Sequence, residues 1–210
     1  MAKSPEITVI LVRCASTEWD DAGRLQGSTD LPLGDRATAA FIASTPQVWT
    51  QVATPPAVIY SASDEGSIAT ARLLAEAAPV GPIKVKPIAG LDAIDLGLWQ
   101  GLLAEEVEQR YPRKFKGWQE DPTSACAPEG EPIADGQARL LAALNKLAEK
   151  ATGPLVVVLR PLEHAMVSLL LAGDPPSSLI RVVEEGPPVY RGVHPRAAFR
   201  ELLGTIKAVA

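Results

Sequence analysis

The feature that most limits the fold of this chain is a series of short, β-branched apolar segments separated by amphipathic helical segments. Short apolar runs of this kind are typical of strands buried in a parallel sheet. The predicted strands are 7–12, 57–60, 83–88, 155–159 and 179–183. The predicted helices are 67–78, 104–110, 133–150, 162–171 and 196–209. This alternation predicts the α/β fold class: a single domain with a mostly parallel central sheet flanked by helices on both faces.

Charge and composition exclude several classes of partner. The formal net charge is −5 and no long run of Lys and Arg occurs, so neither nucleic acid nor a membrane surface is an expected partner. The two cysteines and two histidines have no metal-ligand spacing, and we expect no metal and no cofactor. No signal peptide opens the sequence and the apolar run 166–172 is too short to span a bilayer, which predicts a cytoplasmic protein.

Chemistry in an open α/β sheet is expected just beyond the carboxyl ends of the strands. Four segments of this chain follow predicted strands and carry polar side chains, namely 13–20, 61–66, 91–101 and 160–161. They bring arginine, cysteine, hydroxyl and carboxylate groups to one edge of the predicted sheet. Any ligand site should therefore be assembled from these segments.

The strand-end segments resemble those of the histidine phosphatase superfamily, the phosphoglycerate-mutase-like phosphatases. Residues 12–20 read VRCASTEWD, close to the family's VRHGETEWN, and residues 23–33 read GRLQGSTDLPL, which matches the next family stretch. IDLGLWQG at 94–101 is similar to the family's IDFGxWEG. The resemblance is clearest over 7–173. It implies one phosphoglycerate-mutase-like domain over 1–210, in which 174–210 form a C-terminal strand and helix.

The resemblance implies that, in active members of this family, one histidine attacks phosphorus. A second histidine and two arginines hold the phosphoryl oxygens. A glutamate protonates the leaving group. Carried over by motif, the first arginine corresponds to Arg13, the nucleophile to Cys14, the second arginine to Gly66, the acid to Ala93 and the second histidine to Arg160. Four of these five positions are altered, so no catalytic residue is assigned.

This pattern predicts a pseudoenzyme: a binding or regulatory domain with a remnant phosphate pocket and no enzymatic activity. The alternative is a phosphomonoester hydrolase that works with atypical residues. For that alternative, Cys14 could attack as a thiolate whose pKa is lowered by the adjacent Arg13. His164, one helical turn after Arg160, could supply a base. The simpler interpretation is an inert cysteine and a structural His164, with His194 as a helix-entry residue before Pro195.

Arg13 and Arg160 are the candidate anion-binding residues, because guanidinium groups match the geometry of phosphate oxygens. The competing hypothesis is that Asp20, Asp64 or Glu65 folds in and neutralises them, since an unpaired buried arginine is costly. The expected partner is a phosphate-bearing small molecule or another protein. The sequence also leaves open a homodimer.

Overall fold

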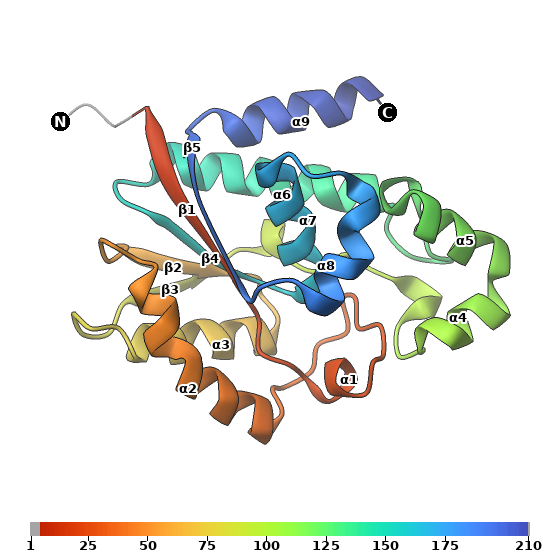
Figure 1. Ribbon diagram of the computed structural model, residues 1–210, viewed down its shortest axis with the longest axis horizontal. Coiled ribbons are helices and arrows are strands. Elements are labelled where there is room, and N and C mark those ends of the chain that lie inside the picture. The colour runs from red at the N-terminus through yellow and green to blue at the C-terminus, as the bar shows by residue number, and fades with distance from the viewer. Residues whose placement is uncertain (1–4, 210) are drawn as a thin grey trace.

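Five strands form one sheet in the order β3–β2–β4–β1–β5 in the computed structural model, which describes residues 5–209 (Figure 1). The first four strands in the chain run parallel to their neighbours, and β5 runs antiparallel to β1 at one edge. The strands are β1 (Glu6–Arg13), β2 (Val58–Ser61), β3 (Lys84–Pro87), β4 (Leu155–Leu159) and β5 (Val189–Pro195). The predicted α/β class is confirmed. The single domain predicted over 1–210 includes residues 1–4 and 210, which lie outside the described part of the chain.

Helices cover both faces of this sheet. They are α1 (Glu18–Asp21), α2 (Asp35–Thr50), α3 (Glu65–Glu76), α4 (Ala104–Arg110), α5 (Pro112–Glu120), α6 (Ile133–Lys150), α7 (Pro161–Ala172), α8 (Leu179–Glu185) and α9 (Ala198–Val209). Figure 1 shows α2 and α3 on one side of the sheet, and α6, α7 and α9 on the other. Within residues 5–209, no helix has the length and apolar character needed to cross a membrane.

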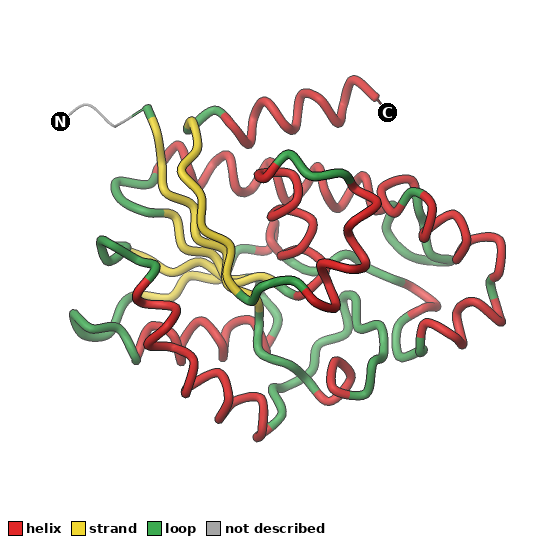
Figure 2. Tube along the Cα trace, viewed as in Figure 1, coloured by secondary structure: helices red, strands yellow, loops and turns green. Residues whose placement is uncertain are grey.

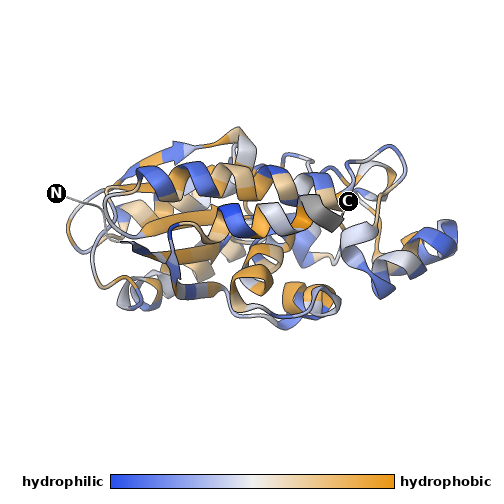
Figure 3. Ribbon diagram, turned by 90° about the horizontal axis from the view of Figure 1, so that it is seen from above, coloured by the Kyte–Doolittle hydropathy of each residue, from blue (hydrophilic) through white to orange (hydrophobic). Residues whose placement is uncertain are grey.

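The two faces of β1 explain why its sequence is apolar without interruption. Side chains of a strand alternate between faces. Ile10 and Val12 join a core cluster with α2 and α3, whereas Val9 and Leu11 join a larger cluster with α6, α7 and α9. Figure 3 shows the apolar strands enclosed between helices whose outer surfaces are hydrophilic. Burial on both sides is what parallel strands between two helix layers require.

The C-terminal segment corrects one prediction. Residues 179–183, expected as a strand, form helix α8, which packs against α7, and the fifth strand is instead β5. The β-branched content of 179–183 favours a strand locally, but the contact with α7 decides the outcome. His194 is not a helix-entry residue, because it lies in β5 opposite Ile7.

The parallel pairing of β1 and β4 determines which loops meet. Arg13 lies opposite Leu159 in the register, and the Cys14 amide donates to the Leu159 carbonyl over 2.8 Å. Residues that follow β1 and β4 are therefore neighbours although about 146 positions separate them in sequence. Figure 2 shows loops and short helices gathered beyond this end of the strands.

Candidate functional site

Arg160 is the best-anchored charged residue at the carboxyl edge of the sheet. Its side chain follows β4 and is almost completely buried. One guanidinium nitrogen lies 2.9 Å from Asp20 Oδ2, the same group donates to Gln26 Oε1, and a second nitrogen lies 3.5 Å from Cys14 Sγ. Asp20 thus neutralises the buried cation.

Asp20 is itself held in place by the start of α1. The Thr17 backbone amide donates to Asp20 Oδ2 over 2.8 Å, and the Asp20 amide donates to the Thr17 hydroxyl over 3.3 Å, which completes a capping box. The two other carboxylates considered from the sequence do not pair with Arg160. Asp64 caps α3 by accepting from the Ser67 amide over 2.9 Å, and Glu65 forms no salt bridge within the described residues.

Cys14 lies behind this ion pair. It is only 4% exposed, and its sulfur lies 3.3 Å from the Ala15 carbonyl oxygen and 3.4 Å from Thr70 Oγ1. Burial raises the pKa of the Cys14 thiol, more than the nearby Arg160 cation lowers it. The protonated thiol is therefore favoured over the nucleophilic thiolate.

Gly66 and Ala93 stand where the resemblance implies the second arginine and the acid, and neither carries a functional group. Gly66 is buried in the first turn of α3, and a Cβ there would lie 3.3 Å from both the Leu31 carbonyl oxygen and a Leu33 methyl carbon. Ala93 lies in the wall of a cavity with only a methyl group. Neither position offers a charge to a phosphoryl group.

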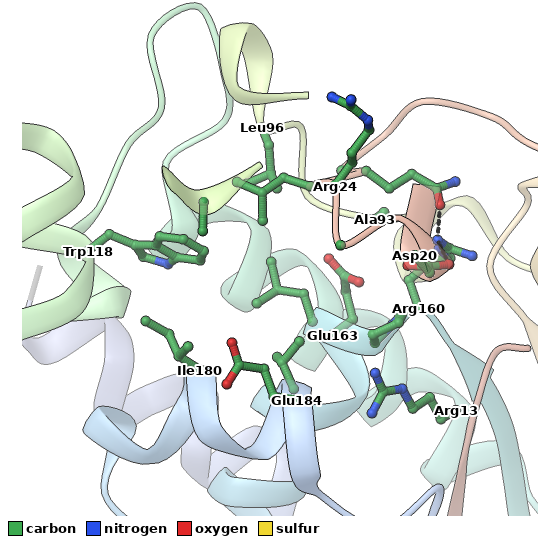
Figure 4. Close-up of a pocket in the computed structure, with 18 of the residues that line it drawn as sticks. Arg13, Asp20, Arg24, Ala93, Leu96, Trp118, Arg160, Glu163, Ile180 and Glu184 are labelled. Carbon is green, nitrogen blue, oxygen red and sulfur yellow. Dashed lines mark hydrogen bonds and ion pairs between the residues drawn. The ribbon is translucent and has the colours of Figure 1, made fainter. Parts of the chain in front are cut away.

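Arg13 differs from Arg160 in the contacts of its guanidinium. It ends β1 and is half-buried. Its backbone amide donates to the Pro188 carbonyl over 2.8 Å, but its guanidinium makes no hydrogen bond or salt bridge to any of residues 5–209. Its guanidinium lines a cavity of about 510 Å³, close to Arg160 (Figure 4). The predicted pair of anion-binding arginines is thus unequal, since Arg160 already has a carboxylate partner.

The cavity lies outside the carboxyl ends of β1 and β4, between the α1 region and helices α5, α7 and α8. Its walls combine charged groups near Arg13 with a larger apolar part near Trp118 and Ile180 (Figure 4). Trp118 is buried and its ring centroid lies 5.4 Å from that of Trp99. Among the described residues, no group of three or more His, Cys, Asp or Glu side chains is arranged to hold a metal ion.

Glu163 is a site residue that our reading of the sequence missed. It lies in the first turn of α7, is only 1% exposed, and Oε1 accepts from the Ile94 amide over 2.8 Å. Oε2 has no hydrogen-bond partner within the described residues, and burial raises the pKa of this carboxyl. Figure 4 shows the group directed toward Ala93. Its place three residues after Arg160, in the turn that follows a strand end, could have signalled it.

Neither histidine of the chain faces the cavity. His164 is buried in α7, where burial lowers its pKa to about 4, and it does not line the cavity. His194 lies in β5, where its Nε2 is 2.9 Å from the Tyr190 hydroxyl. The hypothesis that His164 supplies a displaced base therefore has no geometric support.

A sheet covered on both faces, with arginines at its carboxyl edge beside a cavity, defines an α/β protein whose cavity lies where ligands bind in such sheets. The histidine phosphatase superfamily (branch 1) profile matches residues 9–179. The chain belongs to this superfamily.

Relatives agree with this assignment. Phosphoserine phosphatase 1 of Hydrogenobacter thermophilus is 32% identical over 152 residues, which are 72% of this chain and 69% of that protein. The 2-carboxy-D-arabinitol-1-phosphatase of Triticum aestivum is 28% identical over 170 residues, 78% of this chain but only 32% of that protein.

Solved structures show the same fold. Bacillus stearothermophilus YhfR has a TM-score of 0.70 at 22% identity, covering 86% of this chain and 85% of that one. A mycobacterial glucosyl-3-phosphoglycerate phosphatase has a TM-score of 0.68 at 24% identity, covering 82% and 85% respectively.

Proposed function

We propose that this chain is a non-catalytic member of the histidine phosphatase superfamily that binds a phosphate-bearing small molecule at Arg13 without hydrolysing it. The observation that carries the proposal is the Arg160–Asp20 ion pair beside the buried Cys14 thiol, at the positions that correspond by motif to the two histidines. A phosphoryl acceptor needs an available lone pair, and a protonated, buried thiol does not supply one.

The size of the expected rate loss supports the absence of turnover. Removing a single acid–base group or one electrostatic donor typically lowers a rate by about 10² to 10⁴. Here Gly66 and Ala93 also lack the groups of active relatives. The losses are not additive, but the loss of the nucleophile removes the covalent route as well.

Arg13 supports retained binding. A guanidinium that has no protein partner can donate two parallel hydrogen bonds to phosphate oxygens. The relatives named above as phosphatases support a phosphate ester as the ligand class, because they act on phosphate esters by name. The same cavity would then bind such a compound while leaving it intact.

Binding is tested by thermal unfolding with inorganic phosphate. At about ten times its Kd, phosphate should stabilise the protein by about 1.4 kcal/mol and raise Tm by roughly 3 °C. We expect Arg13→Gln to abolish this rise. Arg72→Gln removes an exposed arginine of α3 outside the cavity and should retain it. Equal shifts in the two variants would contradict the role of Arg13.

Restoring one histidine should not restore catalysis. We expect Cys14→His to show no hydrolysis of p-nitrophenyl phosphate above background, because Arg160, Gly66 and Ala93 remain unsuited to the reaction. Steady-state release of p-nitrophenol, compared with that of the unaltered protein, measures this. Appreciable turnover by the single variant would show that the nucleophile alone was missing.

A second candidate function is phosphomonoester hydrolysis with atypical residues. Glu163 is the observation that favours it, because a carboxyl with a raised pKa beside Ala93 could protonate a leaving-group oxygen in place of the missing acid. The phosphatase names of the relatives favour it too. Hydrolysis of p-nitrophenyl phosphate or phosphoserine that is lost in both Glu163→Gln and Cys14→Ala would replace the non-catalytic proposal with this one.

A further inference from the structure

The cavity beside Arg13 has two ends of different chemistry. The charged end holds Arg13, the Arg160–Asp20 pair and Glu163. The other end is bounded by apolar side chains from four parts of the chain, namely Leu96, Phe115, Trp118, Leu162, Ile180 and Val183. Leu96, Phe115 and Trp118 are buried, so this wall belongs to the packed core and is already formed without a ligand.

The charges around the cavity allow for one anionic group. Among the described residues of its lining, Arg13 is the only cation whose side chain makes no hydrogen bond or salt bridge. Arg24 donates to the Gly101 carbonyl over 2.6 Å and lies 3.5 Å from Glu106, while Arg160 is paired with Asp20. A ligand with a single phosphate matches this arrangement.

The apolar end is unsuited to a second charge or to a set of sugar hydroxyls. Glu184 lies beside Ile180 at this end, where its carboxylate would repel a second anionic group (Figure 4). The polar groups there belong to Gln119 and Glu184, which are both exposed, and to the indole N–H of Trp118, which is buried and has no hydrogen-bond partner within the described residues. A set of sugar hydroxyls buried against Leu162, Trp118 and Val183 would lose most of its hydrogen bonds to water, because the single indole N–H of Trp118 can replace only one of them.

The volume indicates that the ligand fills both ends. About 510 Å³ is far more than a phosphate group needs, and it falls within the range of pockets that enclose a whole small molecule. A compound held at Arg13 by its phosphate would place its organic part against Trp118 and Ile180. Apolar surface removed from water there contributes favourably to binding in proportion to its area.

We propose that the ligand is a phosphomonoester whose organic part is apolar, bound with its phosphate on Arg13 and its body against the Trp118–Ile180 wall. This inference rests on the proposed binding function and adds the class of compound. Phosphosugars and bisphosphates are disfavoured by the same wall that retains an aromatic or aliphatic group.

Isothermal titration calorimetry of the full chain with four probes tests this inference. The probes are 1-naphthyl phosphate, glucose 6-phosphate, fructose 1,6-bisphosphate and inorganic phosphate. We expect 1-naphthyl phosphate to bind at least tenfold more tightly than each of the others, which corresponds to about 1.4 kcal/mol. The preference should depend on the apolar wall and not on Arg13.

Val183→Asp introduces a carboxylate into that wall and should weaken 1-naphthyl phosphate binding at least tenfold, with little effect on inorganic phosphate. Val183→Thr keeps the side-chain shape, so folding should be retained, and a loss of about threefold is expected. Val80→Asp makes the same change as Val183→Asp at an exposed position outside the cavity, and should leave all four affinities unchanged.

The outcomes separate the two proposals. Glucose 6-phosphate or the bisphosphate binding as tightly as 1-naphthyl phosphate would overturn the apolar ligand class while leaving phosphate binding intact. A preference for 1-naphthyl phosphate that survives in both Val183 variants would overturn the assigned wall. If none of the four probes binds, the proposed binding function itself is wrong, and the ligand class falls with it.

Discussion

Replacing Asp20 with alanine should lower the free energy of unfolding by about 3 kcal/mol, measured by urea denaturation at pH 7. The guanidinium of Arg160 is almost completely buried, and Asp20 is its carboxylate partner at 2.9 Å. Gln26 also accepts from Arg160 but carries no charge, so the variant leaves an uncompensated buried cation. Loss of the cap at the start of α1 adds to the effect.

Two further variants identify the cause of that loss. Arg160→Met removes the charge, and in the double variant Asp20→Ala/Arg160→Met much of the stability lost in Asp20→Ala should return, because the buried guanidinium that needed Asp20 is no longer present. Asp21→Ala changes the neighbouring exposed carboxylate of the same short helix and should alter stability by less than about 0.5 kcal/mol. Additive effects of the two site substitutions would show that the ion pair contributes nothing specific.

Acidification from pH 6.5 to pH 4 should destabilise the protein through His164 by about 3 kcal/mol. Burial lowers the pKa of His164 to about 4 from an ordinary value of 6.5. Between these values the unfolded chain binds a proton that the folded chain does not, so stability is complete above pH 6.5 and is lost as the pH falls. Below about pH 4 both states are protonated and the loss levels off.

The His164 contribution is measured as the difference between the pH–stability profiles of the unaltered protein and His164→Leu. A difference is needed because Glu163 acts in the opposite sense: its raised pKa makes the folded state lose stability as the pH rises above the ordinary carboxyl pKa. His194→Gln serves as the control, since His194 is only partly buried, and most of the acid-induced loss should persist. Parallel profiles for His164→Leu and the unaltered protein would refute the prediction.

The two predicted anion-binding arginines differ in whether a carboxylate neutralises them. Arg160 lies where the resemblance implies a histidine, and Asp20 supplies internally the negative charge that a bound phosphate would otherwise bring. Arg13, at the end of the neighbouring strand, forms no salt bridge within residues 5–209, although the nearby charge of Asp20 opposes the lowering of its pKa by burial. The site thus combines one guanidinium that has a carboxylate partner with one that has no salt bridge within residues 5–209, which is the asymmetry on which our proposal of binding without turnover rests.

The sequence by itself determined the features that depend on local pattern. Uninterrupted apolar runs such as 7–12 and 155–159 predict strands that are buried on both faces. Segments with helical periodicity such as 133–150 predict helices, because that spacing places the apolar side chains on one face of a helix. Motif spacing likewise identified the superfamily, and it predicts that Cys14 and Arg160 occupy the positions of the two histidines of active members.

Only the tertiary structure decided the features that depend on distant partners. Residues 179–183 became a helix against α7, while β5 took the sheet edge, because packing and ladder pairing outweigh weak local preferences. Three carboxylates were equally plausible partners for Arg160 in the sequence, and the position of α1 selected Asp20. Within the described part of the chain, the Arg13 guanidinium without a salt bridge, the Glu163 Oε2 without a hydrogen bond and the apolar wall of the cavity all lie where loops from separate strands converge. No local pattern specifies that geometry.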